Sequence, residues 1–418
     1  MKVLVIGGGG REHTIVWKLA GSKKVTKIWC APGNGGISKL AECVNIKAND
    51  VEGVVNFAKQ NNPDMVVVAP DDPLMLGMVD ALQNAGIRAF GPNKNAALIE
   101  GSKTFSKELM QKYNIPTAQF EGFSDMRKAL AYLDTKKTPI VVKADGLALG
   151  KGVVVAATIE EAKKAVVNIM GEKIFGDAGN NIVIEECLVG PEVSVLAFTD
   201  GKTLIPMVSA QDHKRAFDFD EGPNTGGMGT FSPSRLYTDE IAKYCEKEIF
   251  LPTIKAMNHE GRPFKGVLYF GLILTKDGPK VIEYNSRFGD PETQVVLPRL
   301  KTDLYEIFEA VIDEKLHKIN IEWEDNAAVC VVVASGGYPA KYGTGYEIQG
   351  IENAENENVV VFHAGTKIEN GIFLTNGGRV LGVTAIAENL DKAIKTAYSA
   401  VSKISFKDHH YRKDIGIK

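Results

Sequence analysis

The chain has 418 residues, of which 44% are hydrophobic and 24% charged, which is ordinary for a soluble globular protein and predicts two to four domains. The net charge of −3 gives no basic bias toward nucleic acid or an acidic membrane, and no apolar run approaches the ~20 residues of a membrane span. The five cysteines are scattered and form no C-x-x-C pair, which argues against a disulfide framework or a zinc site and favours the reducing cytosol. We therefore expect a cytoplasmic protein without nucleic-acid or membrane partners.

The first ninety residues alternate between short apolar runs and amphipathic segments. We expect strands at residues 3–6, 25–30, 65–69 and 88–90, with helices after the first strand and at residues 51–59 and 74–85. Strands that alternate with helices predict a parallel α/β sheet.

A glycine loop, Gly7-Gly8-Gly9-Gly10-Arg11-Glu12-His13, follows the first strand. Backbone N–H groups at the start of a helix make an anion site. A dinucleotide site is the rival reading, but counting G-x-G-x-x-G from Gly7 or Gly8 puts Glu12 or His13 at the third glycine. No acid follows the second strand, where Ala31-Pro32-Gly33-Asn34 stands. We favour a phosphate site that is not for a dinucleotide, and a ligand-free turn is the other alternative.

Residues 139–156 read as strand, glycine-rich turn and strand. Lys143 ends the first strand, which is unusual because lysine is rarely buried without a partner. Lys151 lies between Gly150 and Gly152, where backbone can approach a ligand closely. The spacing is not that of a Walker A loop, because only three residues separate the glycines and Gly152 follows the lysine. The pattern predicts a flap over phosphates, and a plain hairpin is the alternative.

Two further stretches are candidates for ligand contact. Residues 182–195 read as a strand, an extended linker whose backbone can read an adenine edge, and a second strand. Residues 211–229 form a long loop in which Asp212, His213, Lys214 and Arg215 are consecutive. Loops of this kind are disproportionately functional, so we expect this one to touch substrate.

Residues 281–294 begin like a strand and are interrupted at Gly289-Asp290-Pro291. Residues two apart in a strand share a face, so Glu283, Asn285 and Arg287 should project together. Mg²⁺ takes oxygen ligands and is usually shared with substrate phosphates, and the arginine fork suits a phosphate or carboxylate. The pattern predicts a metal and phosphate site, and a solvated strand edge is the alternative.

The remaining segments complete the predicted architecture. We expect helices at residues 239–259, bent at Pro252, and at 302–317, with a strand at 267–274 between them. A composition shift at residues 320–326 marks a small α+β domain with strands at 329–334, 359–363 and 380–386 and a helix at 390–404. Arg379 is alone in a glycine turn there, and by itself it indicates a structural role.

Together these motifs resemble the glycinamide ribonucleotide synthetase family of ATP-grasp enzymes, also called phosphoribosylamine–glycine ligases. The match runs from the Gly7–His13 loop to Tyr411-Arg412-Lys413-Asp414-Ile415-Gly416, nearly the whole chain. Its most specific motifs are residues 287–294 and 211–215, and residues 142–146 and 362–366 also fit.

The resemblance implies an α/β and α+β multidomain ATP-grasp fold. Its parts are an N-terminal α/β domain at residues 1–106, an ATP-grasp region at 107–320 and a C-terminal domain at 327–418. The ATP-grasp region divides into a flap subdomain at about 122–192 and a central domain at about 193–320. The implied reaction joins glycine to 5-phosphoribosylamine through glycyl phosphate in purine synthesis, with ATP and Mg²⁺ or Mn²⁺. The expected protein is a monomer, with transient contact to the enzyme that makes phosphoribosylamine.

The resemblance also implies roles for individual residues. Lys103 and Lys143 would contact the ATP phosphates, and the flap around Gly150, Lys151 and Gly152 would close over them. Backbone at Glu185, Glu186, Cys187 and Leu188 would read adenine, and Glu192 would hold the ribose. Glu283 and Asn285 match the metal ligands; many relatives carry another acid near Gly271, so the number of ions is left open.

The remaining roles are hypotheses. We expect Arg287 to steady the γ-phosphate or acyl phosphate, and Asp212, Lys214 and Asp290 to hold the glycine and amine ends. We expect the loop with Gly8, Gly9, Arg11 and Glu12 to hold the ribose phosphate together with Arg379, and His213 and Gly289 to be further substrate residues. The alternatives are another ATP-grasp carboxylate–amine ligase, separable by a substrate panel, and a nucleotide-binding protein without turnover.

Overall fold

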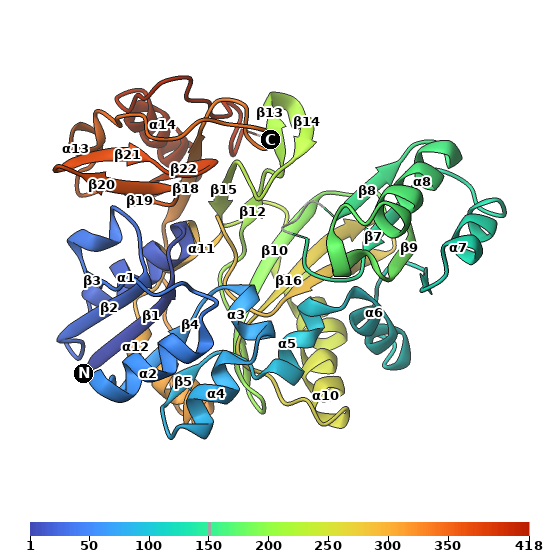
Figure 1. Cartoon of the computed structure of the whole chain (residues 1–418), viewed down its shortest axis with the longest axis horizontal. Helices are drawn as coiled ribbons and strands as arrows, with labels where there is room; N and C mark the ends of the chain where they lie inside the picture. Colours follow the sequence, from blue (N-terminus) through green and yellow to red (C-terminus); the bar gives the residue numbers. More distant parts are fainter. Residues whose placement is uncertain (149–151, 418) are drawn as a thin grey trace.

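The computed structural model describes residues 1–148 and 152–417. Figure 1 shows the N-terminal and C-terminal domains on one side and a smaller lobe, built around β7, β8 and α8, on the other. The long strands β10 and β16 run between them.

The N-terminal domain is the parallel sheet that the sequence predicts. Its order is β3-β2-β1-β4-β5, and every neighbouring pair is parallel. The predicted helix at residues 74–85 is wrong in one respect, because Gly77 has φ +85° and separates two helices. The elements are β1 (Lys2–Gly7), α1 (Gly10–Ala20), β2 (Lys27–Pro32), β3 (Glu42–Cys43), α2 (Val51–Asn61), β4 (Met65–Val68), α3 (Asp71–Met75), α4 (Met78–Asn84) and β5 (Ala89–Phe90).

The smaller lobe is an antiparallel sheet of order β6-β9-β7-β8. Two helices precede it, α5 (Lys94–Gly101) and α6 (Lys103–Lys112), and the Ser102 hydroxyl caps the second by accepting from the Phe105 amide. The apolar sides of α7 and α8 pack on the sheet and form a separate core. Its elements are β6 (Phe120–Phe123), α7 (Met126–Leu133), β7 (Ile140–Ala144), β8 (Val153–Ala156), α8 (Ile159–Val166) and β9 (Ile182–Glu186).

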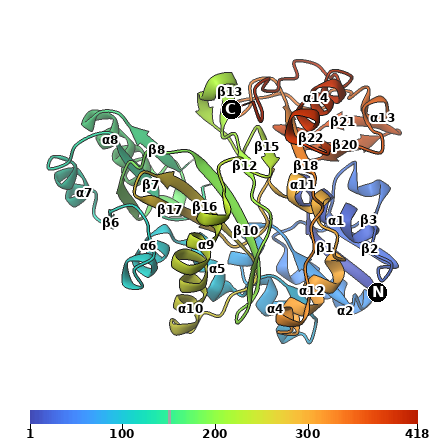
Figure 2. The ribbon, with the colours of Figure 1, turned by 180° about the vertical axis from the view of Figure 1, so that it is seen from behind.

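The central sheet has the order β11-β10-β16-β17 and is antiparallel. Its strands are β10 (Glu192–Asp200), β11 (Leu204–Pro206), β16 (Lys265–Thr275) and β17 (Gly278–Asn285). Helices α9 (Asp239–Cys245) and α10 (Leu251–His259) cover one face (Figure 2) and bury its apolar side chains. A π-helical turn at Glu246–Phe250 joins the two helices just before Pro252, which has no N–H to donate to a helix turn.

The C-terminal sheet has the order β12-β15-β18-β22-β19. We expected residues 211–229 to be a loop, but they contain β12 (Gln211–Asp212), the hairpin β13 (Arg215–Phe217) and β14 (Glu221–Asn224), and the start of β15 (Gly229–Ser232). Strands of two to four residues show no clear alternation, so the sequence could not reveal them. The other strands of the C-terminal domain are β18 (Ala327–Ala334), β19 (Val359–His363), β20 (Thr366–Glu369), β21 (Ile372–Thr375) and β22 (Arg379–Ala387), of which β20 and β21 form a two-stranded sheet of their own. Its helices are α13 (Ile351–Ala354) and α14 (Leu390–Val401).

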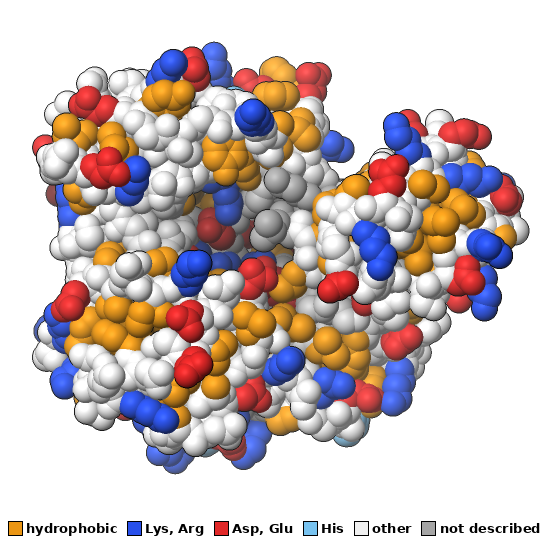
Figure 3. All heavy atoms as spheres, viewed as in Figure 1, with side chains coloured by type: hydrophobic (Ala, Val, Ile, Leu, Met, Phe, Trp, Pro, Cys, Tyr) orange, Lys and Arg blue, Asp and Glu red, His pale blue; other side chains and the backbone are white. Residues whose placement is uncertain are grey.

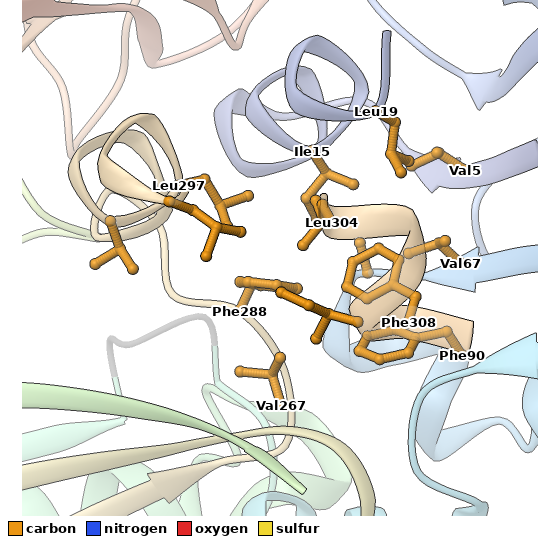
Figure 4. Packing of buried hydrophobic residues seen from close by; sticks show 14 of the residues in the cluster. Val5, Ile15, Leu19, Val67, Phe90, Val267, Phe288, Leu297, Leu304 and Phe308 are labelled. Atoms are coloured by element: carbon orange, nitrogen blue, oxygen red, sulfur yellow. The ribbon is translucent and has the colours of Figure 1, made fainter. Parts of the chain in front are cut away.

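A shared core holds the N-terminal domain against the central sheet. Figure 4 shows Phe288 beside Phe308, with Phe90 and Val67 nearby. The rings of Phe90 and Phe308 stack with centroids 3.9 Å apart, and Phe288 meets Phe308 edge-on at 6.1 Å. Phe308 belongs to α12 (Leu304–Ile312), and α11 (Thr293–Val296) follows closely after Phe288. Close packing of this kind resists displacement, so Phe288 fixes the residues on either side of it.

Two observations bear on the expectations from composition. No helix among residues 1–148 and 152–417 is long and apolar enough to cross a membrane. All five cysteines are free thiols.

Candidate active site

The central sheet turns a polar face toward the space between the domains. Strand pairing puts Ser194, Gly271 and Glu283 side by side on adjacent strands, and the same face continues to Glu192 and Asn285. Figure 3 shows a hollow between the lobes with both basic and acidic side chains on its floor. The opposite face of the sheet is apolar and covered by helices, so only this face is available to a polar ligand.

The three residues of the E-x-N-x-R motif lie together, as the strand alternation predicts. A β-bulge at Ile282 interrupts the pairing of β17 just before Glu283, and regular alternation resumes from there to Asn285. Arg287 lies beyond the strand, and its Nη2 donates to Asn285 Oδ1 at 3.2 Å. The bulge could not be read from the sequence, but it does not separate the motif residues.

Lys214 crosses this face of the sheet. Its Nζ lies 3.1 Å from Glu192 Oε2 and 3.5 Å from Glu283 Oε1. Burial alone would raise the pKa of Glu283, but the positive charges of Lys214, Lys143 and Lys103 lower it, so Glu283 is ionised at neutral pH. Burial lowers the pKa of Lys214, but the negative charges of Glu192 and Glu283 raise it by more. The net effect is a pKa above the usual value for lysine, so Lys214 is charged.

The donor set fits a hard divalent cation that is shared with a ligand. Glu283 supplies an ionised carboxylate, and Asn285 supplies an amide oxygen on the same face. No group of three or more His, Cys, Asp or Glu side chains in the described ranges could hold a metal by itself. Mg²⁺ commonly uses one or two protein oxygens and takes the rest from phosphates and water, so this incomplete set is the expected kind.

A buried charge network lies where the smaller lobe meets the central sheet. The Glu185 carboxylate forms ion pairs with Lys107 Nζ at 2.9 Å and with Lys143 Nζ at 3.0 Å. All three side chains are under 10% exposed. Lys143 also donates to the Ile282 carbonyl oxygen at 3.2 Å, which ties the network to β17. Burial, which Glu185 opposes, lowers the pKa of Lys107 to about 8. The burial of Lys107 could not be predicted from the sequence, because its partner Glu185 is far along the chain.

The candidate ATP residues around this network have different surroundings. Lys103 donates to the Gly146 carbonyl oxygen at 3.1 Å, and burial lowers its pKa. The exposed Glu186 accepts from the Gln119 amide at 3.0 Å, and Cys187 and Leu188 follow in the connection to β10. The Gly152 carbonyl oxygen closes the hairpin by accepting from the Ala144 amide at 2.8 Å. Gly150 and Lys151 lie outside the described residues.

Arg287 is held by acids of the N-terminal domain. Its Nη2 lies 2.9 Å from Glu100 Oε1 and 3.7 Å from Asp71 Oδ2. Glu100 also accepts from the amide and hydroxyl of Ser286, at 2.7 and 2.8 Å. Burial lowers the pKa of Arg287, but the charges of these acids raise it by more. The pKa is therefore above its usual value, and Arg287 stays charged. Arg287 Nε is buried without a hydrogen-bond partner, which leaves one donor available to a ligand. Sequence reasoning missed both acids.

Asp290 and Arg379 meet at the start of α1. Arg379 Nη2 lies 3.4 Å from Asp290 Oδ1, and Nη1 donates to the carbonyl oxygens of Gly226 at 2.6 Å and Asp290 at 2.9 Å. Although burial opposes it, Arg379, Arg11 and hydrogen bonds from Gln294 and the Arg11 backbone lower the pKa of Asp290. The structure therefore joins a residue predicted to hold the glycine and amine ends, Asp290, with one predicted to hold the ribose phosphate, Arg379.

The glycine loop is largely satisfied by its own neighbours. Glu12 accepts from the Gly9 amide and from Arg11 Nε, both at 2.6 Å, and Asn34 Nδ2 donates to the Gly8 carbonyl oxygen at 2.9 Å. Arg11 Nη1 donates to the Phe288 carbonyl oxygen at 3.1 Å. The loop therefore lies directly against the segment that carries Arg287 and Asp290.

The last three candidates are buried in different degrees. His213 is 6% exposed with no partner at Nδ1, and burial followed by the charge of Arg412 lowers its pKa to about 4. Burial and the neighbouring Glu292 raise the pKa of Asp212 well above its usual range. Gly289 packs against Glu292, whose carboxylate oxygen lies 2.5 Å from where a Cβ would stand. The acid at 292 was not predicted, although it lies in the quoted 287–294 motif.

Comparison with known proteins identifies the family. Residues 1–100, 101–293 and 328–418 match the N domain, the ATP-grasp (A) domain and the C domain of phosphoribosylglycinamide synthetase. The chain is 52% identical over 418 residues to a phosphoribosylamine–glycine ligase of Halalkalibacterium halodurans, covering 100% of this chain and 97% of that protein.

Solved structures agree. A phosphoribosylamine–glycine ligase of Thermotoga maritima superposes with a TM-score of 0.85 at 33% identity, covering 99% of this chain and 100% of that one. A biotin carboxylase domain from Hydrogenobacter thermophilus, solved with MgADP and bicarbonate, has a TM-score of 0.77 at 16% identity, covering 98% of this chain and 91% of that one. This second likeness shows the fold alone, and the fold is ATP-grasp.

Proposed function

The chain belongs to the phosphoribosylglycinamide synthetase family, and we propose that its cleft joins glycine to 5-phosphoribosylamine with hydrolysis of ATP to ADP and phosphate. The product is glycinamide ribonucleotide, an intermediate of purine biosynthesis. The enzyme is a ligase with an ATP-grasp fold.

The chemistry explains the composition of the site. A carboxylate does not react with an amine at neutral pH, so glycine is first converted to glycyl phosphate, whose carbonyl the amine then attacks. No protein nucleophile is needed, and catalysis is positioning plus charge neutralisation. Holding reactants in place can contribute ~7–11 kcal/mol of barrier reduction. The cleft, with its acids, lysines and arginines, suits that task.

The phosphate side of the reaction is assigned to the central sheet and the smaller lobe. Lys103 and Lys143 bind phosphates, and their charges already lower the pKa of Glu283. Glu283 and Asn285 would hold Mg²⁺ or Mn²⁺, which neutralises charge on the phosphates. Glu192 holds the ribose of ATP, and backbone at residues 185–188 reads adenine.

The acceptor side is assigned to the opposite wall. Arg287 is held by Glu100, and its Nε, which has no partner within the described residues, would donate to the acyl phosphate. Asp212, Lys214 and Asp290 hold the glycine and amine ends. Arg379, with the start of α1, holds the ribose phosphate, and His213 and Gly289 are further substrate residues. Because Asp290 now pairs with Arg379, the incoming phosphate would have to share or replace that contact.

One observation carries the proposal: Lys214 links the family-specific 211–215 segment to the metal and phosphate face. Its ammonium group lies between Glu192 and Glu283, so the loop that recognises the acceptor is joined to the place where ATP is activated. We further propose that the protein acts as a monomer in the cytoplasm, which fits its free cysteines.

The test is ADP release with Mg²⁺, glycine and freshly generated phosphoribosylamine, omitting each in turn. ADP formation that requires every component, with glycinamide ribonucleotide detected, supports the proposal. A preference for another acid or amine would favour a different ATP-grasp ligase. ATP binding without turnover under any condition would favour a nucleotide-binding protein.

A further inference from the structure

Arg412, in the tail motif that the sequence analysis quoted, is the largest fully buried side chain in the described part of the chain. Its Nε and Nη2 donate to the two carboxylate oxygens of Asp414 at 2.8 and 2.7 Å. Its Nη1 donates to the Arg215 carbonyl oxygen at 3.1 Å and to Asp220 at 2.9 Å. A bidentate pair fixes orientation as well as charge, so this guanidinium joins the C-terminal tail rigidly to the β13–β14 hairpin.

Two more hydrogen bonds connect the same pieces. Asp414 accepts from the Phe219 amide at 2.9 Å, and Asp218 accepts from the Lys413 amide at 2.7 Å. Phe219 and Asp220 have φ values of 62° and 59°, which non-glycine residues hold only where the surroundings determine them. The contacts with the tail supply that constraint, so the hairpin takes its shape from residues 412–414.

The hairpin continues directly into the candidate substrate residues. The Lys214 carbonyl oxygen, just before β13, accepts from the Thr225 amide and hydroxyl, both at 2.8 Å. The carbonyl oxygen of the next residue, Gly226, accepts a hydrogen bond from Arg379 Nη1 at 2.6 Å. The position of the hairpin therefore determines the position of the Lys214 backbone. The backbone position in turn determines how the Lys214 side chain reaches the sheet.

We propose that Arg412 is a positioning residue, which holds the β13–β14 hairpin and thereby keeps the Lys214 ammonium group between Glu192 and Glu283. This inference rests on the proposed function, because that function assigns Lys214 to the glycine and amine ends. The described hydrogen bonds of the Arg412 guanidinium all go to the tail and the hairpin, so Arg412 acts through Lys214 and not on a substrate.

The test compares Arg412→Gln with a matched control, Arg235→Gln. Arg235 also binds the tail, through the Gly416 carbonyl oxygen at 3.5 Å, and it binds Asp391 of α14 at 2.8 Å; neither of these contacts involves the hairpin. We expect Arg412→Gln to raise the KM for glycine about tenfold or more and the KM for ATP by a clearly smaller factor, because Lys214 is assigned to the glycine and amine ends and reaches the ATP side only through its contacts with Glu192 and Glu283. Arg235→Gln should leave both values within about twofold of wild type. Arg412→Lys, which keeps the charge, should restore part of the loss.

Equal rises in the KM for glycine and ATP, or a lower active fraction with both KM values unchanged, would show a merely structural role and overturn the proposal. If Arg412→Gln does not fold, Asp220→Asn replaces it, because the Asp220 side chain is 51% exposed and the change weakens the contact at its hairpin end. The same direction of change in KM for glycine is expected, and no change would contradict the proposal.

Hydrogen exchange separates this inference from the proposed function. Peptides covering residues 213–224 should exchange faster in Arg412→Gln or Asp220→Asn than in wild type, while peptides covering β16 should not. Unchanged exchange in residues 213–224 would refute the proposal that Arg412 holds the β13–β14 hairpin, even if the protein is an active ligase. A wild-type protein that makes no glycinamide ribonucleotide would refute the proposed function, and the exchange data would still decide whether Arg412 holds Lys214.

Discussion

Replacing Glu185 by glutamine should destabilise the junction between the smaller lobe and the central sheet. Glu185 is 3% exposed and is the shared counter-charge of Lys107 and Lys143. Removing one partner of a buried ion pair usually costs ~3–5 kcal/mol, because the other charge is left without compensation. Here two ammonium groups lose the same partner.

The lysine chemistry limits the cost. With Glu185 present, the pKa of Lys107 is already lowered to about 8, which corresponds to about 3 kcal/mol of unfavourable burial at neutral pH. Without Glu185, Lys107 can escape by losing its proton, and a neutral lysine at pH 7 costs at most about 5 kcal/mol relative to a solvated one. The additional cost from Lys107 is therefore about 1–2 kcal/mol, and we expect about 2–4 kcal/mol in total once Lys143 is included.

The pH dependence follows from the sign of the shift. A lysine whose folded-state pKa lies below its unfolded value makes the folded state gain stability as pH rises from about 8 to 10.5. In Glu185→Gln the gain in folding stability starts at a lower pH, because Lys107 loses its proton more easily without the Glu185 charge. The difference in stability between wild type and variant should therefore narrow by about 1–2 kcal/mol between pH 7 and pH 9, where Lys107 is neutral in both proteins.

Hydrogen exchange of peptides covering β7 and β9 is the assay, because it reads local opening free energies that a global unfolding curve of a multidomain chain does not. Glu186→Gln is the matched control: it changes the neighbouring, exposed acid and should alter opening by under about 0.5 kcal/mol. A variant as stable as wild type, or a difference equal at pH 7 and pH 9, would refute the reasoning.

Three further predictions concern the metal, the ribose phosphate and the tail. Glu283→Gln should weaken Mn²⁺ binding, followed by electron paramagnetic resonance with ATP present, about tenfold or more, because a ligand charge is lost; unchanged affinity would remove the metal assignment. Arg379→Ala should raise the KM for phosphoribosylamine far more than the KM for ATP, and equal effects on both would contradict its role. Asp414→Asn should cost about 2 kcal/mol at pH 6, because Arg412 lowers the pKa of Asp414 to about 2 from 3.8 despite burial, and its side chain is 8% exposed. That cost should shrink as pH falls from about 4 to about 2, where the folded carboxyl also takes up its proton, and a urea-unfolding difference that does not shrink would be the opposite result.

The sequence predicted those parts of the fold in which the local pattern matches the final environment. Strands β1, β2, β4 and β5 of the N-terminal sheet are largely buried and read as apolar runs, so their order along the chain was clear. The exposed two-residue strand β3 was not predicted, because it has no apolar pattern. Strands β12 and β15 were missed because they are short, and because β15, on which β12 pairs, itself pairs with β18 about a hundred residues later. Gly77 was a visible break, but a single glycine inside a helical pattern does not decide between a tolerated residue and a boundary.

The site shows the same division. Glu283 and Asn285 could be placed on one face because strand alternation is local, and the bulge at Ile282 did not alter it. The partner of Arg287 could not be predicted, because Glu100 comes from a helix of another domain. Lys107 looked like any lysine on a helix, and only the fold shows that it is buried against Glu185. The pairing of distant charges is a property of the tertiary structure and leaves no spacing in the sequence.

The most direct test of the account is the fate of the glycine carboxylate oxygens. Glycine labelled with ¹⁸O in its carboxylate would be turned over with ATP and phosphoribosylamine, and the released phosphate would be analysed by mass spectrometry. If the carboxylate attacks the γ-phosphorus and the amine then expels phosphate, one ¹⁸O atom passes from each glycine into phosphate and the other stays in the amide product. Phosphate without label, or label in AMP, would contradict activation through glycyl phosphate in this cleft.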